Sequence, residues 1–137
     1  MKAYAKQNGI EYDAQDGFFP LRGSDISKTA VNVAHENAKN AGVEELVSIF
    51  CGDVAESKPH ASCGLILINP PYGERIGANP QLYKSVGDGW KKNFPKWTAW
   101  LLSSNESLTK SVGLRSTRKF SVYNGNLECR FLQYVMY

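Results

Sequence analysis

The sequence predicts an α/β fold in which an open, mostly parallel sheet ends in an antiparallel hairpin. Apolar runs typical of buried strands alternate with segments whose apolar residues recur at helical spacing. The resulting order, β-α-β-β-α-β-α-β-β, is typical of parallel strands joined by helical crossovers, with a hairpin at the end. The 137 residues, 42% of them hydrophobic, suffice for one domain with one core.

The first half of the chain predicts strand, helix and strand. Residues 1–20 carry weak local signals and are expected to be a poorly defined N-terminal segment, so the domain is expected over residues 21–137. A strand should lead to Asp25, and Ser27 can cap the next helix, which carries alanine and valine at helical spacing and ends at Gly42. The run from Leu46 to Cys51 predicts a second strand, closed by Gly52 and Asp53.

The next segment predicts a buried strand followed by a rigid turn and a long helix. Cys63 to Ile68 is apolar throughout, which is typical of a parallel strand covered on both faces. It runs directly into Asn69-Pro70-Pro71-Tyr72, where the prolines forbid further strand or helix. One stripe of a helix ending at Pro95 is then predicted from four apolar residues spaced four apart: Leu82, Val86, Trp90 and Phe94.

The last third predicts a strand, a short helix and a hairpin. Trp97 to Leu102 is an apolar strand, and Ser103 with Glu106 has the spacing of a capping box that opens a helix through Val112. Asn124-Gly125-Asn126 is a turn signal between two further runs. These runs predict the hairpin strands, Lys119 to Tyr123 and Leu127 to Tyr137.

Composition excludes several classes of protein. Uninterrupted apolar runs such as Leu65 to Ile68 are far shorter than the roughly 20 residues that cross a bilayer. Charged residues interrupt the first thirty positions, where a signal peptide would be apolar. Three cysteines without a CxxC pair, and two histidines without neighbouring ligands, predict neither a disulfide framework nor a metal site. We therefore expect a cytoplasmic protein that does not insert in membranes.

Charge is distributed unevenly along the chain. Residues 1–83 carry seven Lys/Arg against ten Asp/Glu, a balance of −3, whereas residues 84–119 carry eight against two, a balance of +6. This basic stretch can attract phosphate groups, and it can equally be a solvated, lysine-rich helix surface.

Polar residues follow three predicted strands, where ligands bind in open α/β sheets. Asp25 follows the first strand, Asp53 the second and Asn69 the third. An acidic residue in this position often accepts hydrogen bonds from ribose hydroxyls, although Asp25 could instead cap the helix and Asp53 could be an ordinary turn residue.

Asn69-Pro70-Pro71-Tyr72 has a joint chemical interpretation. Two prolines hold the backbone extended and remove its donors, so the Asn69 side chain and the Pro70 carbonyl can both accept from one amino group. An adjacent tyrosine ring can stack on a base. Such an arrangement would hold an exocyclic NH2 and free its lone pair to attack a methyl donor.

The continuation Gly73-Glu74-Arg75-Ile76-Gly77 makes this motif resemble that of the S-adenosylmethionine-dependent RNA methyltransferases that modify the guanine exocyclic amine. Members of this family usually carry a THUMP domain. The resemblance extends over residues 21–137 and is closest to the bacterial 23S ribosomal RNA guanine-N2 enzymes. It is carried by further segments of the chain: Gly23-Ser24-Asp25-Ile26, Asn32-Val33-Ala34, Glu36-Asn37-Ala38, Leu82-Tyr83-Lys84, Gly87-Asp88, and Asn124-Gly125 before Glu128-Cys129-Arg130.

The resemblance implies a Rossmann-like methyltransferase sheet and S-adenosylmethionine as the cofactor. It implies cofactor contacts from Asp25, Ile26, Asp53 and Asn69, with Asp25 on the ribose and Asp53 near the adenine amine. It also implies catalytic roles for Asn69, Pro70, Pro71 and Tyr72, and RNA, in particular 23S ribosomal RNA, as the partner.

The chain departs from the family at its beginning. Residues 1–22 do not provide the family's first strand with its glycine-rich loop, nor the THUMP domain, so we expect a partial methyltransferase domain of doubtful activity by itself. The strands on either side of the missing one would have apolar edges, which can close together or associate in a homodimer. Two further hypotheses stay open: methylation of adenine N6 in DNA or RNA, and a noncatalytic interaction module that keeps the fold.

Overall fold

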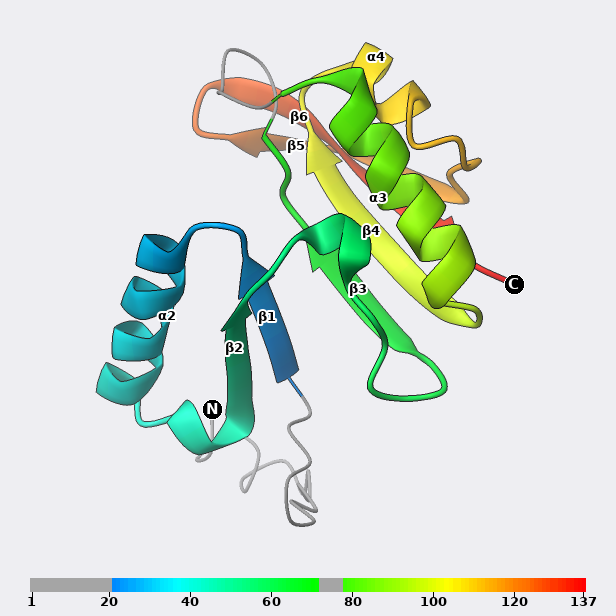
Figure 1. Ribbon diagram of the computed structural model, residues 1–137. Coiled ribbons are helices and arrows are strands. Elements are labelled where there is room, and N and C mark those ends of the chain that lie inside the picture. The colour runs from blue at the N-terminus through cyan, green and yellow to red at the C-terminus, as the bar shows by residue number, and fades with distance from the viewer. Residues whose placement is uncertain (1–20, 72–77) are drawn as a thin grey trace, which may run out of the picture. The chain divides into compact units, whose positions relative to one another are not determined.

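The computed structural model describes residues 21–71 and 78–137, and it divides the chain into two compact units, Met1–Val54 and Ala55–Tyr137. The order of helices and strands is the predicted one, with two short 3₁₀ turns, Glu44–Leu46 and Val54–Glu56, added in the loops (Figure 1). Within the described residues no helix combines the length and the apolar character that a membrane span requires.

The first unit contains β1 (Leu21–Asp25), α2 (Lys28–Asn40) and β2 (Val47–Cys51). The two strands pair in parallel with Asp25 opposite Cys51, so their carboxyl ends lie side by side. Ser27 caps α2 as predicted, because its Oγ accepts from the Ala30 N–H at 3.3 Å. Gly42, at φ +63°, leaves the helix in a conformation that glycine adopts without strain.

The second unit contains a four-stranded sheet in the order β3-β4-β6-β5. β3 (Gly64–Ile68) and β4 (Trp97–Ser103) are parallel, and β6 (Leu127–Val135) is antiparallel to both β4 and β5 (Arg118–Asn124). The hairpin is therefore confirmed, and its second strand lies inside the sheet. Asn124 pairs with Leu127 across a two-residue loop whose first residue, Gly125, has φ +61°, which is typical of a type II′ turn.

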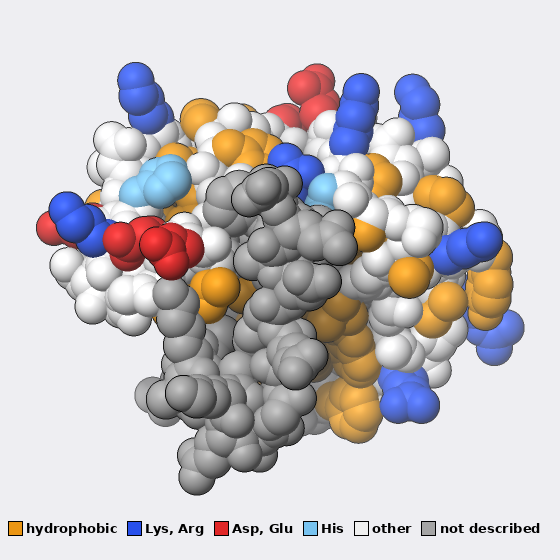
Figure 2. Space-filling view, turned by 90° about the horizontal axis from the view of Figure 1, so that it is seen from below, with side chains coloured by type: hydrophobic (Ala, Val, Ile, Leu, Met, Phe, Trp, Pro, Cys, Tyr) orange, Lys and Arg blue, Asp and Glu red, His pale blue; other side chains and the backbone are white. Residues whose placement is uncertain are grey.

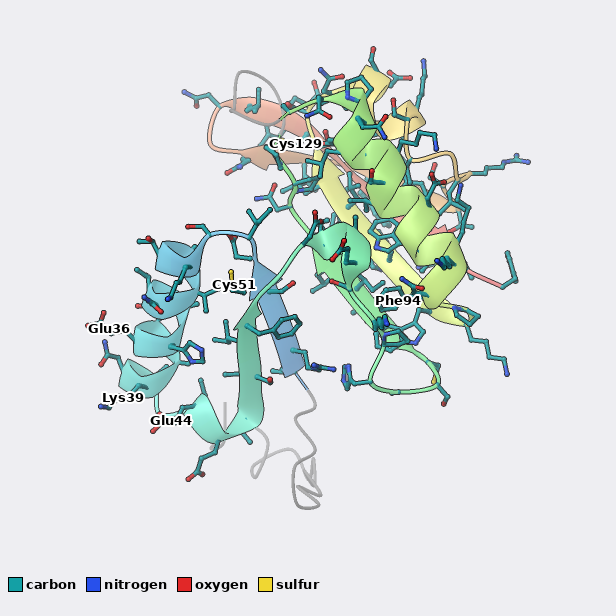
Figure 3. All side chains as sticks on the ribbon, in the orientation of Figure 1. Glu36, Lys39, Glu44, Cys51, Phe94 and Cys129 are labelled. Atoms are coloured by element: carbon teal, nitrogen blue, oxygen red, sulfur yellow. The ribbon has the colours of Figure 1, made fainter. Side chains whose placement is uncertain are left out.

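The core of the second unit lies between this sheet and α3 (Pro80–Asn93). α3 buries Val86 and Trp90 of the predicted stripe together with Tyr83 and Gly87, whereas Leu82, the first residue of the stripe, is only half-buried. Trp90 packs against Tyr134 of β6 with ring centroids 5.9 Å apart. Phe94, at the end of α3, packs edge-on against Trp97 at 5.3 Å (Figure 3).

The predicted capping box before the short helix α4 (Glu106–Lys110) is wrong. The N-cap is Asn105, whose Oδ1 accepts from the Leu108 N–H at 3.0 Å. Ser103 is still the last residue of β4, and its Oγ accepts from the Asn105 N–H at 3.1 Å. The strand continues one residue further than local spacing indicated, because Ser103 pairs with Arg130 of β6.

The prediction that β3 is covered on both faces is also wrong for the part of the chain that the structure describes. Gly64 and Ile66 pair with Trp97 and Ala99, both buried on the side of α3. Leu65 and Leu67 face the other way and are 57% and 68% exposed. β3 is an edge strand of its sheet, and the apolar run that predicted burial here has a covered face and an exposed one.

Candidate functional site

Two groups of predicted site residues lie at the carboxyl ends of strands, one group in each unit. Asp25, Ile26 and Asp53 follow β1 and β2 in the first unit. Asn69, Pro70 and Pro71 follow β3 in the second. Tyr72, the fourth residue of the predicted catalytic motif, lies outside the described residues, as does the continuation to Gly77.

The loop after β1 is ordered by hydrogen bonds that leave its acidic side chain accessible. The Asp25 carboxylate accepts from the Ser27 N–H at 2.7 Å, while the Asp25 carbonyl accepts from the Gly52 N–H at 3.0 Å. Asp25 itself is exposed and is not the N-cap of α2, a role taken by Ser27. The carboxylate is thus held at the strand end by a turn, with its charge facing solvent.

The second strand end is tied to the first. Cys51, at the end of β2 (Figure 3), has its Sγ 3.4 Å from the Ile26 carbonyl oxygen, and Asp53 follows two residues later with an exposed side chain. Ile26 is 76% exposed although it is apolar. The carboxylates of Asp25 and Asp53 are suited to accept hydrogen bonds from hydroxyl or amino groups. The exposed Ile26 side chain is suited to pack against one face of a flat ring.

The Asn69-Pro70-Pro71 segment leaves β3 at the end where β4 also terminates. Asn69 is exposed and Pro70 is buried. The Pro71 carbonyl accepts from the Tyr83 O–H at 3.2 Å, and the Tyr83 hydroxyl lies 3.1 Å from Ser103 Oγ. The proline segment is therefore fixed to both α3 and β4, with the asparagine side chain accessible.

Sequence reasoning assigned no functional role to Tyr83 and expected Ser103 only to cap a helix. Tyr83 is 1% exposed and Ser103 is fully buried. The neighbouring Tyr134 shows how apolar this part of the core is. Burial raises the pKa of Tyr134 to about 12, and the electrostatic effect of Tyr83 contributes to the shift. A tyrosine at helical spacing from Val86 and Trp90 was the available signal, although the sequence could not show what its hydroxyl contacts.

The basic stretch is partly neutralised within α3. Asp88 binds Lys84 at 2.6 Å and Lys91 at 2.7 Å, and hydrogen bonds from these two lysines lower the pKa of Asp88 to about 2. Lys110 pairs with Glu106 at 3.4 Å. On the face drawn in Figure 2 the Lys and Arg side chains stand apart rather than in one patch. The structure therefore favours the solvated-surface interpretation for much of this stretch.

Among the described residues, no cluster of three or more His, Cys, Asp or Glu side chains could hold a metal ion.

Comparison with known proteins places these observations in a family. The model of the RMKL-like methyltransferase domain, UPF0020, matches residues 1–133 and so includes the N-terminal segment where sequence analysis expected no match. The ribosomal RNA large subunit methyltransferases K/L of Shewanella frigidimarina and Shewanella baltica are 39% and 40% identical to this chain over 84% of its length. The chain spans only 17% of the length of each.

Solved structures give the same result. A possible methylase from Clostridium difficile is 34% identical, with a TM-score of 0.79, and the match covers 90% of this chain and 33% of that one. A predicted N6-adenine-specific DNA methylase from Listeria monocytogenes is 29% identical, with a TM-score of 0.73, and the match covers 85% and 30% of the two chains.

The fold is also shared with a more distant structure. TrmK of Mycoplasma capricolum, solved with S-adenosyl-homocysteine, is 13% identical with a TM-score of 0.60, and the match covers 97% of this chain and 55% of that one. The Rossmann-like α/β fold is thus confirmed, and with it the predicted resemblance: this chain belongs to the RMKL-like methyltransferase domain family.

Proposed function

We propose that this chain is the base- and cofactor-binding part of an RNA methyltransferase that acts on the exocyclic amine of guanine. The observation that carries the proposal is the Asn69-Pro70-Pro71 segment, which leaves β3 with Asn69 exposed and Pro71 held by Tyr83. An accessible amide oxygen at a strand end, next to a proline segment that a hydrogen bond holds in place, is suited to bind an NH2 group.

The chain's own residues would orient the amine. The Asn69 Oδ1 and the Pro70 carbonyl would each accept one hydrogen of the NH2 group, which turns the nitrogen lone pair away from both acceptors. No strong general base is needed, because the amine proton becomes acidic only as the new N–C bond forms. Tyr72 would stack on the base and contribute roughly 1–3 kcal/mol to its binding.

S-adenosylmethionine would supply the electrophilic methyl group. TrmK, which shares the fold, was solved with the demethylated product of this donor. The exposed carboxylates at the ends of β1 and β2 fit its polar groups, with Asp25 on the ribose hydroxyls and Asp53 near the adenine amine. Ile26, 76% exposed, offers an apolar contact for the adenine ring.

Ribosomal RNA is the proposed substrate, since the Shewanella relatives are named for methylation of large subunit ribosomal RNA. These relatives are several times longer than this chain. We propose that an RNA-binding domain such as THUMP acts together with it. The exposed apolar side chains of the edge strand β3 also support a homodimer formed through this edge. Light scattering on the purified chain would test that association.

Methylation of adenine N6 is the second candidate, because the same acceptors fit that amine and the Listeria structure carries that name. The experiment incubates the chain with labelled S-adenosylmethionine at millimolar concentration and either large subunit ribosomal RNA or adenine-containing DNA. Nucleoside analysis by mass spectrometry should give N2-methylguanosine from the RNA. N6-methyladenine in either nucleic acid would establish the second candidate, and no methylation in either would favour the noncatalytic module.

Asn69→Ala provides the matched test of mechanism. Loss of a preorganised acceptor should lower the methylation rate on the order of 10²-fold or more, with little change in S-adenosylmethionine affinity. Turnover equal to that of the unmodified chain would remove Asn69 from the mechanism.

A further inference from the structure

A chain of hydroxyl groups crosses the core beneath the proline segment. Tyr83 of α3 and Ser103 of β4 are 1% and 0% exposed, among apolar neighbours such as Val86, Trp90 and Leu101. Burying two hydroxyls costs free energy unless both are hydrogen bonded. Their oxygens are 3.1 Å apart, and each also bonds to a backbone group of a loop.

The direction of these hydrogen bonds is fixed by chemistry. The Asn105 N–H can only donate, so Ser103 Oγ accepts from it at 3.1 Å. The Pro71 carbonyl can only accept, so the Tyr83 hydroxyl uses its single proton on it, at 3.2 Å. The bond between the two hydroxyls must therefore run from Ser103 to Tyr83. The three donors, Asn105 N–H, Ser103 O–H and Tyr83 O–H, therefore follow one another in a single direction toward Pro71. In such a series each hydrogen bond polarises the next.

We call this series of hydrogen bonds, from Asn105 through Ser103 and Tyr83, the relay. It ends at the Pro71 carbonyl group in the candidate amine-binding segment, Asn69-Pro70-Pro71. Pro70 and Pro71 have no N–H, so the backbone of these two residues can be anchored only through their carbonyls and their ring packing. Because the peptide group is planar, holding the Pro71 carbonyl oxygen also fixes the orientation of the peptide plane to which it belongs. The Pro70 carbonyl, one of the two proposed acceptors, belongs to the adjoining peptide group.

We propose that Tyr83 is a positioning residue that holds Asn69-Pro70-Pro71 in the geometry required for amine binding, and that Ser103 supports it. The hydroxyl of Tyr83 does not touch the reacting groups and acts through the Pro71 carbonyl. This proposal rests on the proposed function for its catalytic consequence, whereas the anchoring itself is a property of the chain alone.

The first test measures the anchor without any reaction. NMR spectra of the isotopically labelled chain report the Pro71 carbonyl carbon and the Asn69 side-chain amide. Tyr83→Phe removes the donor and keeps the ring, so the Pro71 carbon should shift upfield and the Asn69 signals should move. Tyr134→Phe is the matched control, because it removes a phenol from the same core, 2% exposed, and should leave both signals in place.

Ser103→Ala distinguishes a relay from a local contact. Ser103 does not bond to Pro71, yet its loss should shift the Pro71 carbon in the same direction as Tyr83→Phe, by a smaller amount. The double variant should show less than the sum of the two shifts. If Tyr83→Phe folds and its Pro71 and Asn69 signals are unchanged, the proposal is overturned. If Tyr83→Phe does not fold, an unchanged Pro71 signal in Ser103→Ala overturns it instead.

The second test uses methyl transfer to the substrate identified above. Tyr83→Phe should lower kcat by up to the order of 10²-fold while the KM for S-adenosylmethionine stays constant, and Tyr134→Phe should change neither. An unchanged kcat together with moved Asn69 signals would refute the positioning role. If the unmodified chain transfers no methyl group, the chain by itself lacks the proposed activity, and the NMR signals still decide whether Tyr83 anchors the segment.

Discussion

Gly87→Ala should destabilise the second unit, although alanine is the better helix former. A Cβ at Gly87 would overlap the Val112 carbonyl oxygen and lie 2.8 Å from the Val112 carbonyl carbon, so α3 and the turn after α4 would have to separate. Gly87 is one helical turn after Tyr83 on the same buried face. Moving α3 would therefore also stretch the 3.2 Å hydrogen bond that holds Pro71.

The size of the effect follows from three contributions. Overpacking of this kind costs about 1–3 kcal/mol, and leaving the buried Tyr83 hydroxyl unsatisfied costs a further ~1–3 kcal/mol. The gain in helix propensity from glycine to alanine offsets about 1 kcal/mol. The net loss should be about 3 kcal/mol, within a range of about 1–5 kcal/mol.

Urea unfolding followed by tryptophan fluorescence measures this loss selectively, because all three tryptophans, Trp90, Trp97 and Trp100, lie in the second unit. Ser85→Ala on the same helix is the control and should change the free energy of unfolding by less than about 0.5 kcal/mol. If Gly87→Ala unfolds at the same urea concentration as the unmodified chain, or at a higher one, then α3 does not approach Val112 this closely and the reasoning is refuted.

Three further predictions concern the cofactor and charge. Asp25→Asn keeps an acceptor for the Ser27 N–H but loses the charge, so in a chain that binds S-adenosylmethionine it should weaken binding and leave thermal stability nearly constant; equal affinity would refute the ribose role. Titration calorimetry of the 137-residue chain should give a Kd in the millimolar range or weaker, because the sequence of residues 1–22 contains no glycine-rich motif. Micromolar binding would show that another segment takes the part of such a motif. NMR titration should give Asp88 a pKa of about 2. The stability that its ion pairs with Lys84 and Lys91 contribute should be complete above the unfolded pKa of about 3.9 and should be lost as the pH falls through 2. Lys91→Ala should raise the pKa of Asp88, because it removes one of the two lysines that lower it.

Local chemistry in the sequence determined the order of the helices and strands. Ser27 and Gly42 bound α2, and Gly125 makes the two-residue turn of the hairpin, because each acts on backbone groups within a few residues. The same holds for the positions of Asp25, Asp53 and Asn69, which follow strands that their own residues predict. Their joint pattern was also enough to indicate the family.

Only the tertiary structure decided what the buried polar groups do. Tyr83 bonds to Pro71 across 12 residues and to Ser103 across 20, so no local spacing could reveal either contact. Ser103 matched a capping box, yet pairing with Arg130 keeps it in β4 and Asn105 caps the helix instead. Leu65 and Leu67 are a further example, because their apolar run predicted a strand buried on both faces and both side chains are exposed. The sequence of a strand does not show which of its faces other elements cover, since that depends on its place in the sheet.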